Sequence, residues 1–338
     1  MKSHLLLGVA LATVMASAVA SCGSKATTAE TVEADTLFVK PLSVKGKALV
    51  NADGDTMVLT GPSMGWHTNW GRFYSDSTVM ALKQKWGANI TRAAIGAHPS
   101  YDCQRAYSVD SAYAVDCAIA LIDGAIANDM YVIADWHSHD NTIADAKEFF
   151  EVISSKYGDD PHIIYEIWNE PVEVTWDSIK AYAAEVIPVI RKNAPSSVII
   201  IPTGHWDQDV ETAAADPIQG VDNLLYNVHF YAGTHKEYLR EKTQAAIDSG
   251  LPMIISECGS MSASGDEALD IESWNAWVEL ADTNNLTMLL WDIADKDESC
   301  SMLTPGAPSN GMQWTEENFK PWAKIAQETI KSRNTMHK

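Results

Sequence analysis

The chain has 338 residues, of which 46% are hydrophobic, including 12 tryptophans and 11 tyrosines. This composition excludes an intrinsically disordered protein and is sufficient for one large core. Its 45 acidic side chains outnumber the 24 basic ones and give a formal net charge of -21 at pH 7, which argues against nucleic acid and other polyanions as partners.

The first 21 residues have the layout of a secretory signal peptide, with Lys2, an apolar run over residues 5–20, and then Ser21 and Cys22. The segment Val19-Ala20-Ser21-Cys22 resembles a bacterial lipoprotein box, which predicts cleavage before Cys22 and attachment of lipid to its thiol. Ordinary cleavage nearby is the alternative. Either event exports the protein, and lipidation predicts anchoring to the bacterial outer membrane, facing the periplasm or the cell surface.

Residues 22–41 are mostly Ser, Thr, Ala and acids, a composition that predicts a flexible tether. A lipidated Cys22 leaves four other cysteines, for which three pairings are possible: Cys103, Cys117, Cys258 and Cys300. Cys258 follows Glu257, and Cys300 lies in the loop after the last predicted strand. Both are therefore expected near the same end of the domain, and a Cys258–Cys300 disulfide is a hypothesis for an exported protein. No cysteine or histidine spacing indicates zinc.

Residues 42–333 are predicted to form a single folded domain. It begins with a β-hairpin over residues 42–57, with its turn at Asp53-Gly54, which we expect to close the bottom of a barrel. Eight apolar runs then predict strands over residues 57–63, 89–95, 130–137, 163–169, 198–203, 225–230, 253–257 and 287–292. Amphipathic patterns predict helices over residues 77–85, 111–128, 145–156, 176–193, 236–248, 270–283 and 319–332.

Strands that alternate with helices require right-handed parallel crossovers, and eight such units predict an α/β protein with a (β/α)8 TIM barrel. An open doubly wound sheet is the structural alternative, but no glycine-rich turn follows the first strand to favour it.

The carboxyl ends of the predicted strands carry an unusual set of polar and aromatic residues. Glu170 ends the run IIYEIWNEP, where Pro171 stops the strand, and Glu257 ends a similar run in PMIISECG. The other residues at these ends are Trp66, Arg92, His137, Asn169, His205, Trp206, His229, Tyr231, Trp291 and Asp292. Because catalytic groups of TIM barrels lie at this end, we expect these side chains to surround one cavity.

Two facing glutamates are what glycoside cleavage requires: one protonates the leaving oxygen and the other attacks the anomeric carbon or activates water. Arg92 and Tyr231 are expected to hold Glu257 ionised as the nucleophile. Glu170, with no obvious cation near it in the sequence, is expected to be the general acid and base.

The remaining candidates have supporting roles. His137 and His229 are expected to bind sugar hydroxyls or orient the glutamates, with satisfied core histidines as the alternative. Indole rings stack on the apolar face of a pyranose, and four tryptophans are candidates for such a platform: Trp291, Trp206, Trp70 and Trp66.

With these residues in view, the chain resembles glycoside hydrolase family 5, and within it the bacterial endo-β-1,4-glucanases. The motifs are WGANITRAAI, YVIADWH, YEIWNEP, TGHWDQDV, VHFYAGTH, ISECG and WDIADKDESCSMLTPGAP. The resemblance implies a TIM barrel and retaining hydrolysis without a metal or other cofactor, with Glu170 as acid/base and Glu257 as nucleophile. It implies supporting roles for Arg92, His137, Asn169, His229, Tyr231 and Trp291, glycone-side binding by Lys296 and Glu298, and an aglycone-side platform at Trp206.

Two positions depart from the family pattern. Cys258 stands where Trp is usual after the nucleophile, and the segment Gly65 to Gly71 is rearranged relative to the usual His-Gly-Leu-Gln-Trp. Because of these departures, the family pattern does not define the distal sugar subsites of this chain.

The expected substrate is a cellulose-type or mixed-linkage β-glucan, and the expected state is a monomer. An endo-β-1,4-mannanase or a xyloglucanase would use the same mechanism. Another alternative is a metal-dependent amidohydrolase, because Asp135 to Asp140 contains a His-x-His pair, with His205, His229 and Asp292 on later strands. A further alternative is a surface glycan-binding lipoprotein without enzymatic activity.

Overall fold

The computed structural model describes residues 39–99 and 105–337. The predicted signal peptide, the lipidation site Cys22, most of the tether and Cys103 lie outside these ranges. Within the described ranges no helix has both the length and the apolarity needed to cross a membrane.

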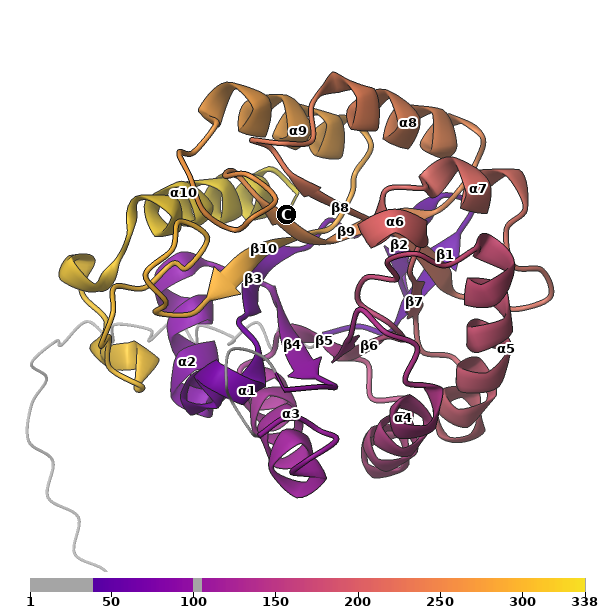
Figure 1. Cartoon of the computed structure of the whole chain (residues 1–338), viewed down its shortest axis with the longest axis horizontal. Helices are drawn as coiled ribbons and strands as arrows, with labels where there is room; N and C mark the ends of the chain where they lie inside the picture. The colour runs from indigo at the N-terminus through magenta and orange to yellow at the C-terminus, as the bar shows by residue number, and fades with distance from the viewer. Residues whose placement is uncertain (1–38, 100–104, 338) are drawn as a thin grey trace, which may run out of the picture. The chain divides into compact units, whose positions relative to one another are not determined.

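Eight parallel strands close into a barrel in the order β10-β3-β4-β5-β6-β7-β8-β9 (Figure 1). They are β3 (Thr60–Met64), β4 (Ile90–Gly96), β5 (Tyr131–His137), β6 (Ile163–Glu166), β7 (Ile199–Ile201), β8 (Leu224–Tyr231), β9 (Met253–Gly259) and β10 (Met288–Ile293). The predicted TIM barrel is therefore confirmed, and each strand overlaps its predicted range. β3, β6 and β7 are shorter than predicted, because each of them pairs with its neighbours over only part of its apolar run.

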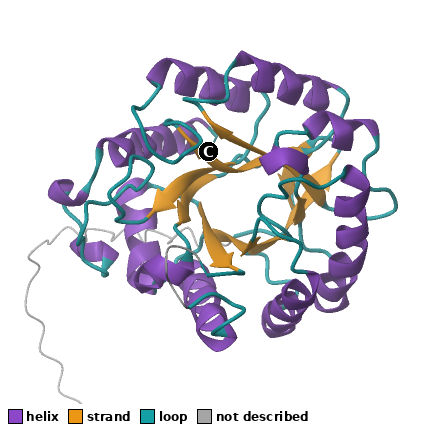
Figure 2. Cartoon of the chain, viewed as in Figure 1, coloured by secondary structure: helices purple, strands orange, loops and turns teal. Residues whose placement is uncertain are grey.

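Helices surround the barrel (Figure 2). Those predicted from the sequence are α2 (Asp76–Ala81) continued by η2 (Leu82–Trp86), α3 (Ser111–Ala127), α4 (Ile143–Tyr157), α5 (Trp176–Asn193), α8 (Glu237–Asp248), α9 (Ile271–Thr283) and α10 (Pro321–Met336). The sequence analysis missed the short segments α1 (His67–Trp70), η1 (Gly71–Phe73), α6 (Gly204–Asp207), α7 (Val210–Ala215), η3 (Gly311–Gln313) and η4 (Glu316–Asn318). Most have fewer than two turns, too few for a helical period to show in a sequence.

The N-terminal hairpin is present, but its predicted turn was wrong. β1 (Leu42–Lys45) pairs with β2 (Ala48–Asn51), so the chain turns at Gly46 and Lys47, where Gly46 has a φ of +59°. Asp53-Gly54 forms a second turn, after which Thr56 bridges back to Val50. Leu42 and Leu49 pack on apolar side chains at the amino ends of the barrel strands, so the hairpin closes the barrel floor as expected.

The barrel interior changes character from one layer to the next. The floor layer includes Ile90, Ile133, Ile164, Leu225, Ile254 and Leu289. Because successive strand residues alternate between the two faces, the residues two positions further along also point inward. These are Arg92, Asp135, Glu166, Asn227, Ser256 and Trp291, all buried. An apolar floor thus supports a polar layer, and the predicted site lies above it.

A register shift places Glu257 at the cavity. Asn227 pairs with Ile254 but His229 pairs with Glu257, so β9 gains one residue relative to β8. The extra residue lets both Ser256 and Glu257 reach the interior, since a bulge breaks the strict alternation of faces. Cys258 then faces outward and lies deeply buried, with its thiol against the Leu289 carbonyl at 3.3 Å.

We predict that Gly61→Ala prevents stable folding. A Cβ atom on Gly61 of β3 would lie 1.7 Å from the carbonyl oxygen of Ile90 in the neighbouring strand. Backbone there has no freedom to move away, so the expected loss in the free energy of unfolding is about 4 kcal/mol or more. Denaturant unfolding of the purified variant measures it. In the control Gly220→Ala the Cβ meets nothing within 4 Å and only the positive φ of +75° is penalised, at about 1–2 kcal/mol. Equal losses in the two variants would contradict the prediction.

Candidate active site

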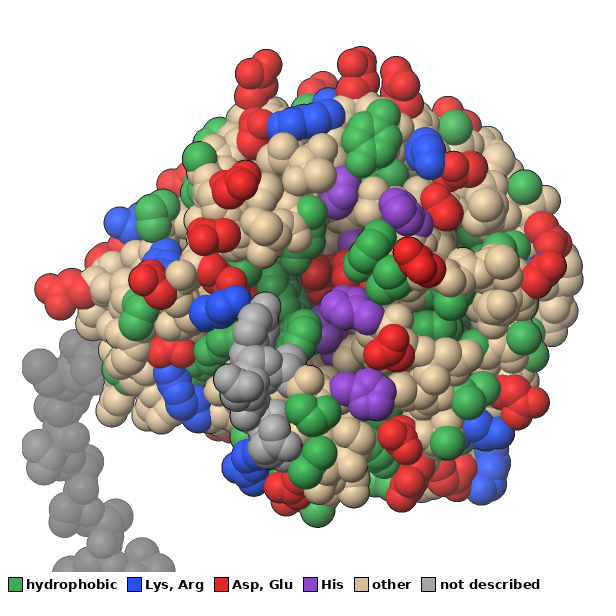
Figure 3. Space-filling view, in the orientation of Figure 1, with side chains coloured by type: hydrophobic (Ala, Val, Ile, Leu, Met, Phe, Trp, Pro, Cys, Tyr) green, Lys and Arg blue, Asp and Glu red, His purple; other side chains and the backbone are tan. Residues whose placement is uncertain are grey.

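A cleft of about 570 Å³ opens at the carboxyl ends of the barrel strands. Figure 3 shows it as a hollow near the middle of this face, where histidines gather around acidic and apolar side chains. Its walls include twelve residues from the predicted set: Trp66, Trp70, His137, Glu170, His205, Trp206, His229, Tyr231, Glu257, Trp291, Asp292 and Glu298. Arg92 and Asn169 are buried and do not line it, while Lys296 forms an ion pair with Glu298 in its wall.

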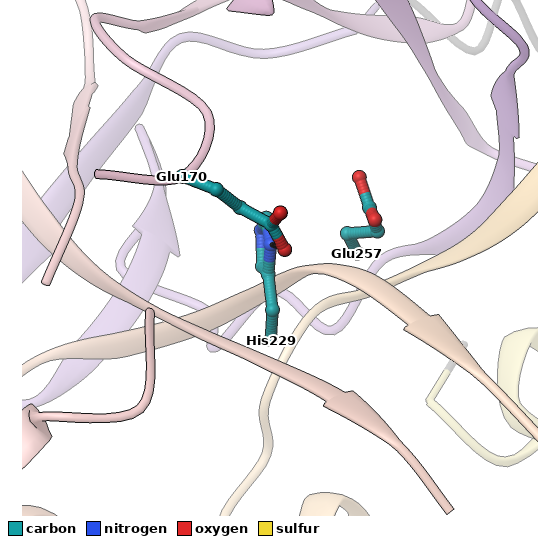
Figure 4. Close-up of side chains that lie close together, drawn as sticks. All are labelled: Glu170, His229 and Glu257. Carbon is teal, nitrogen blue, oxygen red and sulfur yellow. Dashed lines mark hydrogen bonds and ion pairs between the residues drawn. The ribbon is translucent and has the colours of Figure 1, made fainter. Parts of the chain in front are cut away.

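The two glutamates face each other across this cleft. A carboxylate oxygen of Glu170, one of Glu257 and a ring nitrogen of His229 all lie within 4.8 Å of one another (Figure 4). Glu170 follows β6, and Glu257 lies near the end of β9. Both are nearly buried, with exposed fractions of 8% and 4%. Their side chains therefore meet in a largely water-poor part of the cleft.

Arg92 holds Glu257 from below. Its Nη1 donates to Glu257 Oε2 at 3.0 Å, while its Nε and Nη2 make a two-point bond to Glu166 at 2.7 and 3.1 Å. Nη2 also donates to Asn169 Oδ1 at 2.6 Å and lies 3.0 Å from Asp135 Oδ2. Burial lowers the pKa of Arg92, but these carboxylates outweigh it and raise the pKa well above its usual range. The guanidinium is a permanent buried cation.

Tyr231 holds the other oxygen of Glu257. Its hydroxyl donates to Oε1 at 2.7 Å. Burial raises the pKa of the Tyr231 phenol well above its usual range, and the charge of Glu257 adds to this rise. The phenol therefore keeps its proton and remains a hydrogen-bond donor. Arg92 and Tyr231 are thus partners of Glu257, as the sequence predicted.

Glu170 has two histidine partners, although no cation was obvious near it in the sequence. His229 Nδ1 lies 2.8 Å from Oε1, and His139 Nε2 lies 3.1 Å from Oε2. Burial raises the pKa of Glu170, but the hydrogen bonds and charges of the two histidines outweigh it and hold the pKa well below its usual range. His229 was expected to bind sugar hydroxyls or to orient the glutamates, and it does contact Glu170. His139 was not expected as a partner, because it lies in a loop 31 residues away in the sequence.

His229 is the buried one of these two histidines. Burial lowers its pKa, but the charge of Asp207 and the bond to Glu170 outweigh burial and raise the pKa to about 9. Its Nε2 lies 2.9 Å from Ser256 Oγ, whose hydroxyl donates to Glu166 Oε1 at 2.6 Å. Nδ1 therefore faces the Glu170 carboxylate, while Nε2 lies between the Ser256 hydroxyl at 2.9 Å and the Asn227 amide nitrogen at 2.7 Å.

His137 has a different role. Burial lowers its pKa to about 3, and the nearby charge of Arg92 acts in the same direction, so the ring is neutral. Nδ1 lies 2.7 Å from Asp135 Oδ2, and the ring stacks on Trp291 with centroids 5.2 Å apart. This contact fixes the indole of Trp291 at the cleft wall, so His137 orients a platform rather than a glutamate.

The other aromatic residues line the two ends of the cleft. Trp66 packs against His137 with ring centroids 5.2 Å apart, and Trp70 lies in the same wall. Trp206, which is 38% exposed, and Tyr238 also line the cleft. Glu298 lies at the cleft and forms an ion pair with Lys296. Asn169 offers its amide, because Nδ2 has no partner among the described residues.

The hypothesis of a Cys258–Cys300 disulfide was wrong. Both thiols are free. Cys258 faces outward behind β9, whereas Cys300 lines the cleft beside Glu298, so the two side chains leave the backbone on different sides of the barrel wall. The period-two alternation, broken by the bulge before Glu257, decides which way Cys258 points.

The sequence analysis did not select several residues that complete the site as support for the glutamates: Glu166, Asp135, His139, Asp207, Asn227 and Ser256. One signal was present in the sequence. Glu166, Asp135, Asn227 and Ser256 each stand two residues after a floor residue of the same strand, in runs that are otherwise apolar. A polar residue at an inward position of a buried strand needs partners there.

The only group of described residues arranged to hold a metal ion is Glu170, His229 and Glu257. Each of these side chains already has partners: Glu170 is bonded to histidines, His229 to a carboxylate, and Glu257 to Arg92 and Tyr231. The donor set also includes an imidazolium, which must lose its proton to bind a metal. These residues suit a pair of reacting carboxylates better than a metal.

Comparisons with known proteins agree with this geometry. Residues 50–297 match the family model for cellulase, glycosyl hydrolase family 5. Endoglucanase Z of Dickeya dadantii is 40% identical over 273 residues, which are 79% of this chain and 63% of that protein. Endoglucanase A of Evansella cellulosilytica is 38% identical over 82% of this chain and 57% of its own length. The chain thus spans about three fifths of these relatives.

Among solved structures, the catalytic domain of Thermobifida fusca endoglucanase Cel5A superposes with a TM-score of 0.81 at 29% identity, over 87% of this chain and 98% of that domain. A structure from Cytophaga hutchinsonii gives a TM-score of 0.83 at 35% identity, over 88% and 96%. The amidohydrolase alternative was therefore wrong, and His137 and His139 serve as partners of Asp135 and Glu170 instead. The chain belongs to glycosyl hydrolase family 5, the cellulase family.

Proposed function

We propose that the protein is an endo-acting β-1,4-glucanase that retains configuration at the anomeric carbon. The observation that carries this proposal is the pair of facing glutamates, one held by Arg92 and Tyr231 and the other by His139 and His229. Two carboxylates in different environments are what a double displacement needs, because one must attack while the other transfers a proton.

Glu257 is the proposed nucleophile. Its two oxygens receive hydrogen bonds from different donors, Oε2 from Arg92 and Oε1 from Tyr231. These bonds fix the carboxylate so that a lone pair is aimed into the cleft, and a fixed nucleophile needs little reorganisation before attack. Attack on the anomeric carbon forms a covalent glycosyl-enzyme and breaks the bond to the leaving oxygen.

Glu170 is the proposed acid and base. At neutral pH its carboxylate and the His229 imidazolium together hold one transferable proton, located in the 2.8 Å contact between His229 Nδ1 and Oε1. Strongly coupled groups of this kind titrate as a unit. The pair delivers the proton to the leaving oxygen and later takes one from the attacking water.

The separation of the glutamates favours retention. Retaining enzymes place the two carboxyl groups about 5–5.5 Å apart, whereas inverting enzymes leave about 6.5–9.5 Å for a water molecule. Here carboxylate oxygens of the two side chains lie within 4.8 Å. That spacing supports direct attack by Glu257 over activation of a water.

A glucan substrate is supported by the cleft walls and by the relatives. Trp66, Trp70, Trp206 and Trp291 all line the cleft and supply flat apolar faces on which pyranose rings can stack. The similar T. fusca domain has also been crystallised with cellotetraose. We further propose, from residues 1–22, export and lipid attachment at Cys22, with a monomeric catalytic domain.

We expect the purified protein to release short oligosaccharides fastest from carboxymethyl-cellulose and mixed-linkage glucan. Reducing ends and product lengths are measured side by side on these two polymers, glucomannan, xyloglucan and xylan. Preference for glucomannan or xyloglucan would replace the glucanase assignment by mannanase or xyloglucanase with the same mechanism. Binding without cleavage of any polymer would favour a non-catalytic glycan-binding protein.

We predict that Glu257→Gln lowers kcat by about 10⁴-fold or more, because an amide is a poor nucleophile. Glu170→Ala is expected to slow natural glucans severely but to spare aryl cellobiosides with activated leaving groups in the first step, since these need no proton. Azide, a nucleophile that needs no base, should then restore turnover of Glu170→Ala and give a β-glycosyl azide. An α-glycosyl azide would contradict retention, and unchanged hydrolysis by Glu257→Gln would contradict the assignment of the nucleophile.

Tyr231→Phe is predicted to lower kcat by about 10- to 100-fold with little change in KM, because the hydroxyl that fixes Glu257 is lost. The matched control is Tyr182→Phe. That buried hydroxyl donates to the carbonyl of Ile167 at 2.8 Å and touches neither glutamate, so only thermal stability should fall. A Tyr231→Phe variant that keeps full kcat would show that Arg92 alone positions Glu257.

A further inference from the structure

Three consecutive residues after β7 have a left-handed backbone. His205, Trp206 and Asp207 have φ values of +56°, +54° and +59°. Residues other than glycine rarely adopt this conformation, and three in a row require that the surrounding structure hold them. Their side chains point to different places: His205 and Trp206 are exposed at the cleft, whereas Asp207 is completely buried.

Two hydrogen-bonding groups anchor this turn. The Trp206 N–H donates to the carbonyl of Pro171 at 3.0 Å, directly after Glu170. The Asp207 carboxylate accepts the Thr203 N–H at 2.6 Å through Oδ1 and the Asn227 amide at 2.8 Å through Oδ2. Asp207 therefore ties the turn to the polar layer inside the barrel.

Asp207 also faces the far side of the His229 ring. Its Oδ2 lies 3.4 Å from Nε2, while Nδ1 on the opposite edge lies 2.8 Å from Glu170 Oε1. The imidazole is thus placed between two carboxyl groups, one of which reaches the cleft. The mechanism proposed above uses Glu170 and His229 but assigns nothing to Asp207.

We propose that Asp207 is a positioning residue that keeps His229 charged and thereby sets the pH range in which Glu170 works as acid and base. The inference rests on the proposed function and extends it to a residue that does not touch the cleft. The left-handed turn is the structural device that brings this carboxyl from the cleft wall to the back of the imidazole.

The charges around the ring support this role. The groups that face His229 are Asp207, Glu170, Glu166 and Glu257, with the uncharged Asn227 and Ser256. Burial is the largest influence on His229 and lowers its pKa, and the charge of Asp207 is the largest influence that raises it. For Asp207, burial raises the pKa well above its usual range, and the charges of Glu170 and Glu166 add to this rise, while the charge of His229 and the Thr203 N–H oppose it.

The charges around His229 determine the direction of the expected shift in the pH profile. Since the pKa of His229 is raised to about 9, the His229–Glu170 pair keeps its transferable proton below that pH and loses it as the pH rises further. Removing the charge of Asp207 lowers the pKa of His229. The alkaline limb of kcat/KM therefore moves to lower pH, and the acid limb moves less.

The test compares Asp207→Asn with Asp209→Asn, a matched change in the same loop that touches neither His229 nor Glu170. With a natural β-glucan, we expect the alkaline limb of Asp207→Asn to move down by about one pH unit. Asp209→Asn should follow the wild type, and Asp207→Glu, which keeps the charge, should recover part of the shift. Activated aryl cellobiosides should show a smaller shift, because their first step needs no proton.

Identical alkaline limbs for wild type and Asp207→Asn would overturn the proposal. Where Asp207→Asn does not fold, NMR titration of ¹⁵N-labelled histidine in the wild type decides. A His229 ring that keeps both protons through pH 8 supports the proposal, and one that loses a proton near its ordinary pKa of about 6.5 overturns it. This titration needs no substrate, so failure of the inference remains distinct from failure of the proposed function.

Discussion

The site depends on one buried guanidinium. Arg92 has no exposed surface, yet it contacts Asp135 of β5, Glu166 and Asn169 in and just after β6, and Glu257 of β9. Removing a charged side chain from water is costly unless every donor finds a partner. All donors of Arg92 find partners only when the barrel is closed and its strands are in register. The contacts that position Glu257 therefore form only in the correctly folded barrel. The apolar floor below and the hairpin that closes it are needed to keep this charge cluster dry.

Above Arg92, the two glutamates are distinguished by their partners. Glu257 is held by a guanidinium that cannot release a proton and by a phenol with a strongly raised pKa. Glu170 is held by imidazoles, which exchange protons near neutral pH. Proton transfer is therefore confined to one side of the cleft. The identity of the hydrogen-bond donors, more than burial, decides which carboxylate attacks and which shuttles a proton.

The barrel and its eight strands were predictable because each strand is a short apolar run ended by a turn or proline, and both glutamates followed from their position at strand ends. Three features were not. The turn at Gly46 was missed because Asp53-Gly54 is the stronger turn sequence. The outward direction of Cys258 depends on a bulge that local sequence does not reveal. The histidine partners of Glu170 depend on contacts over 31 and 59 residues, which no local pattern contains.

The polar layer inside the barrel supports the active site but lowers the stability of the fold. Asp135, Glu166, Asp207 and Asp292 are fully or almost fully buried, and burial raises the pKa of each, that of Asp135 to about 7. A carboxyl group whose pKa is higher in the folded than in the unfolded state makes the protein less stable as the pH rises above the pKa of the unfolded state. A barrel built for stability alone would have apolar residues at these inward positions. The polar side chains at these positions mark this layer as the support of the site, because the buried Arg92 and His229 need hydrogen-bonding partners in a dry interior.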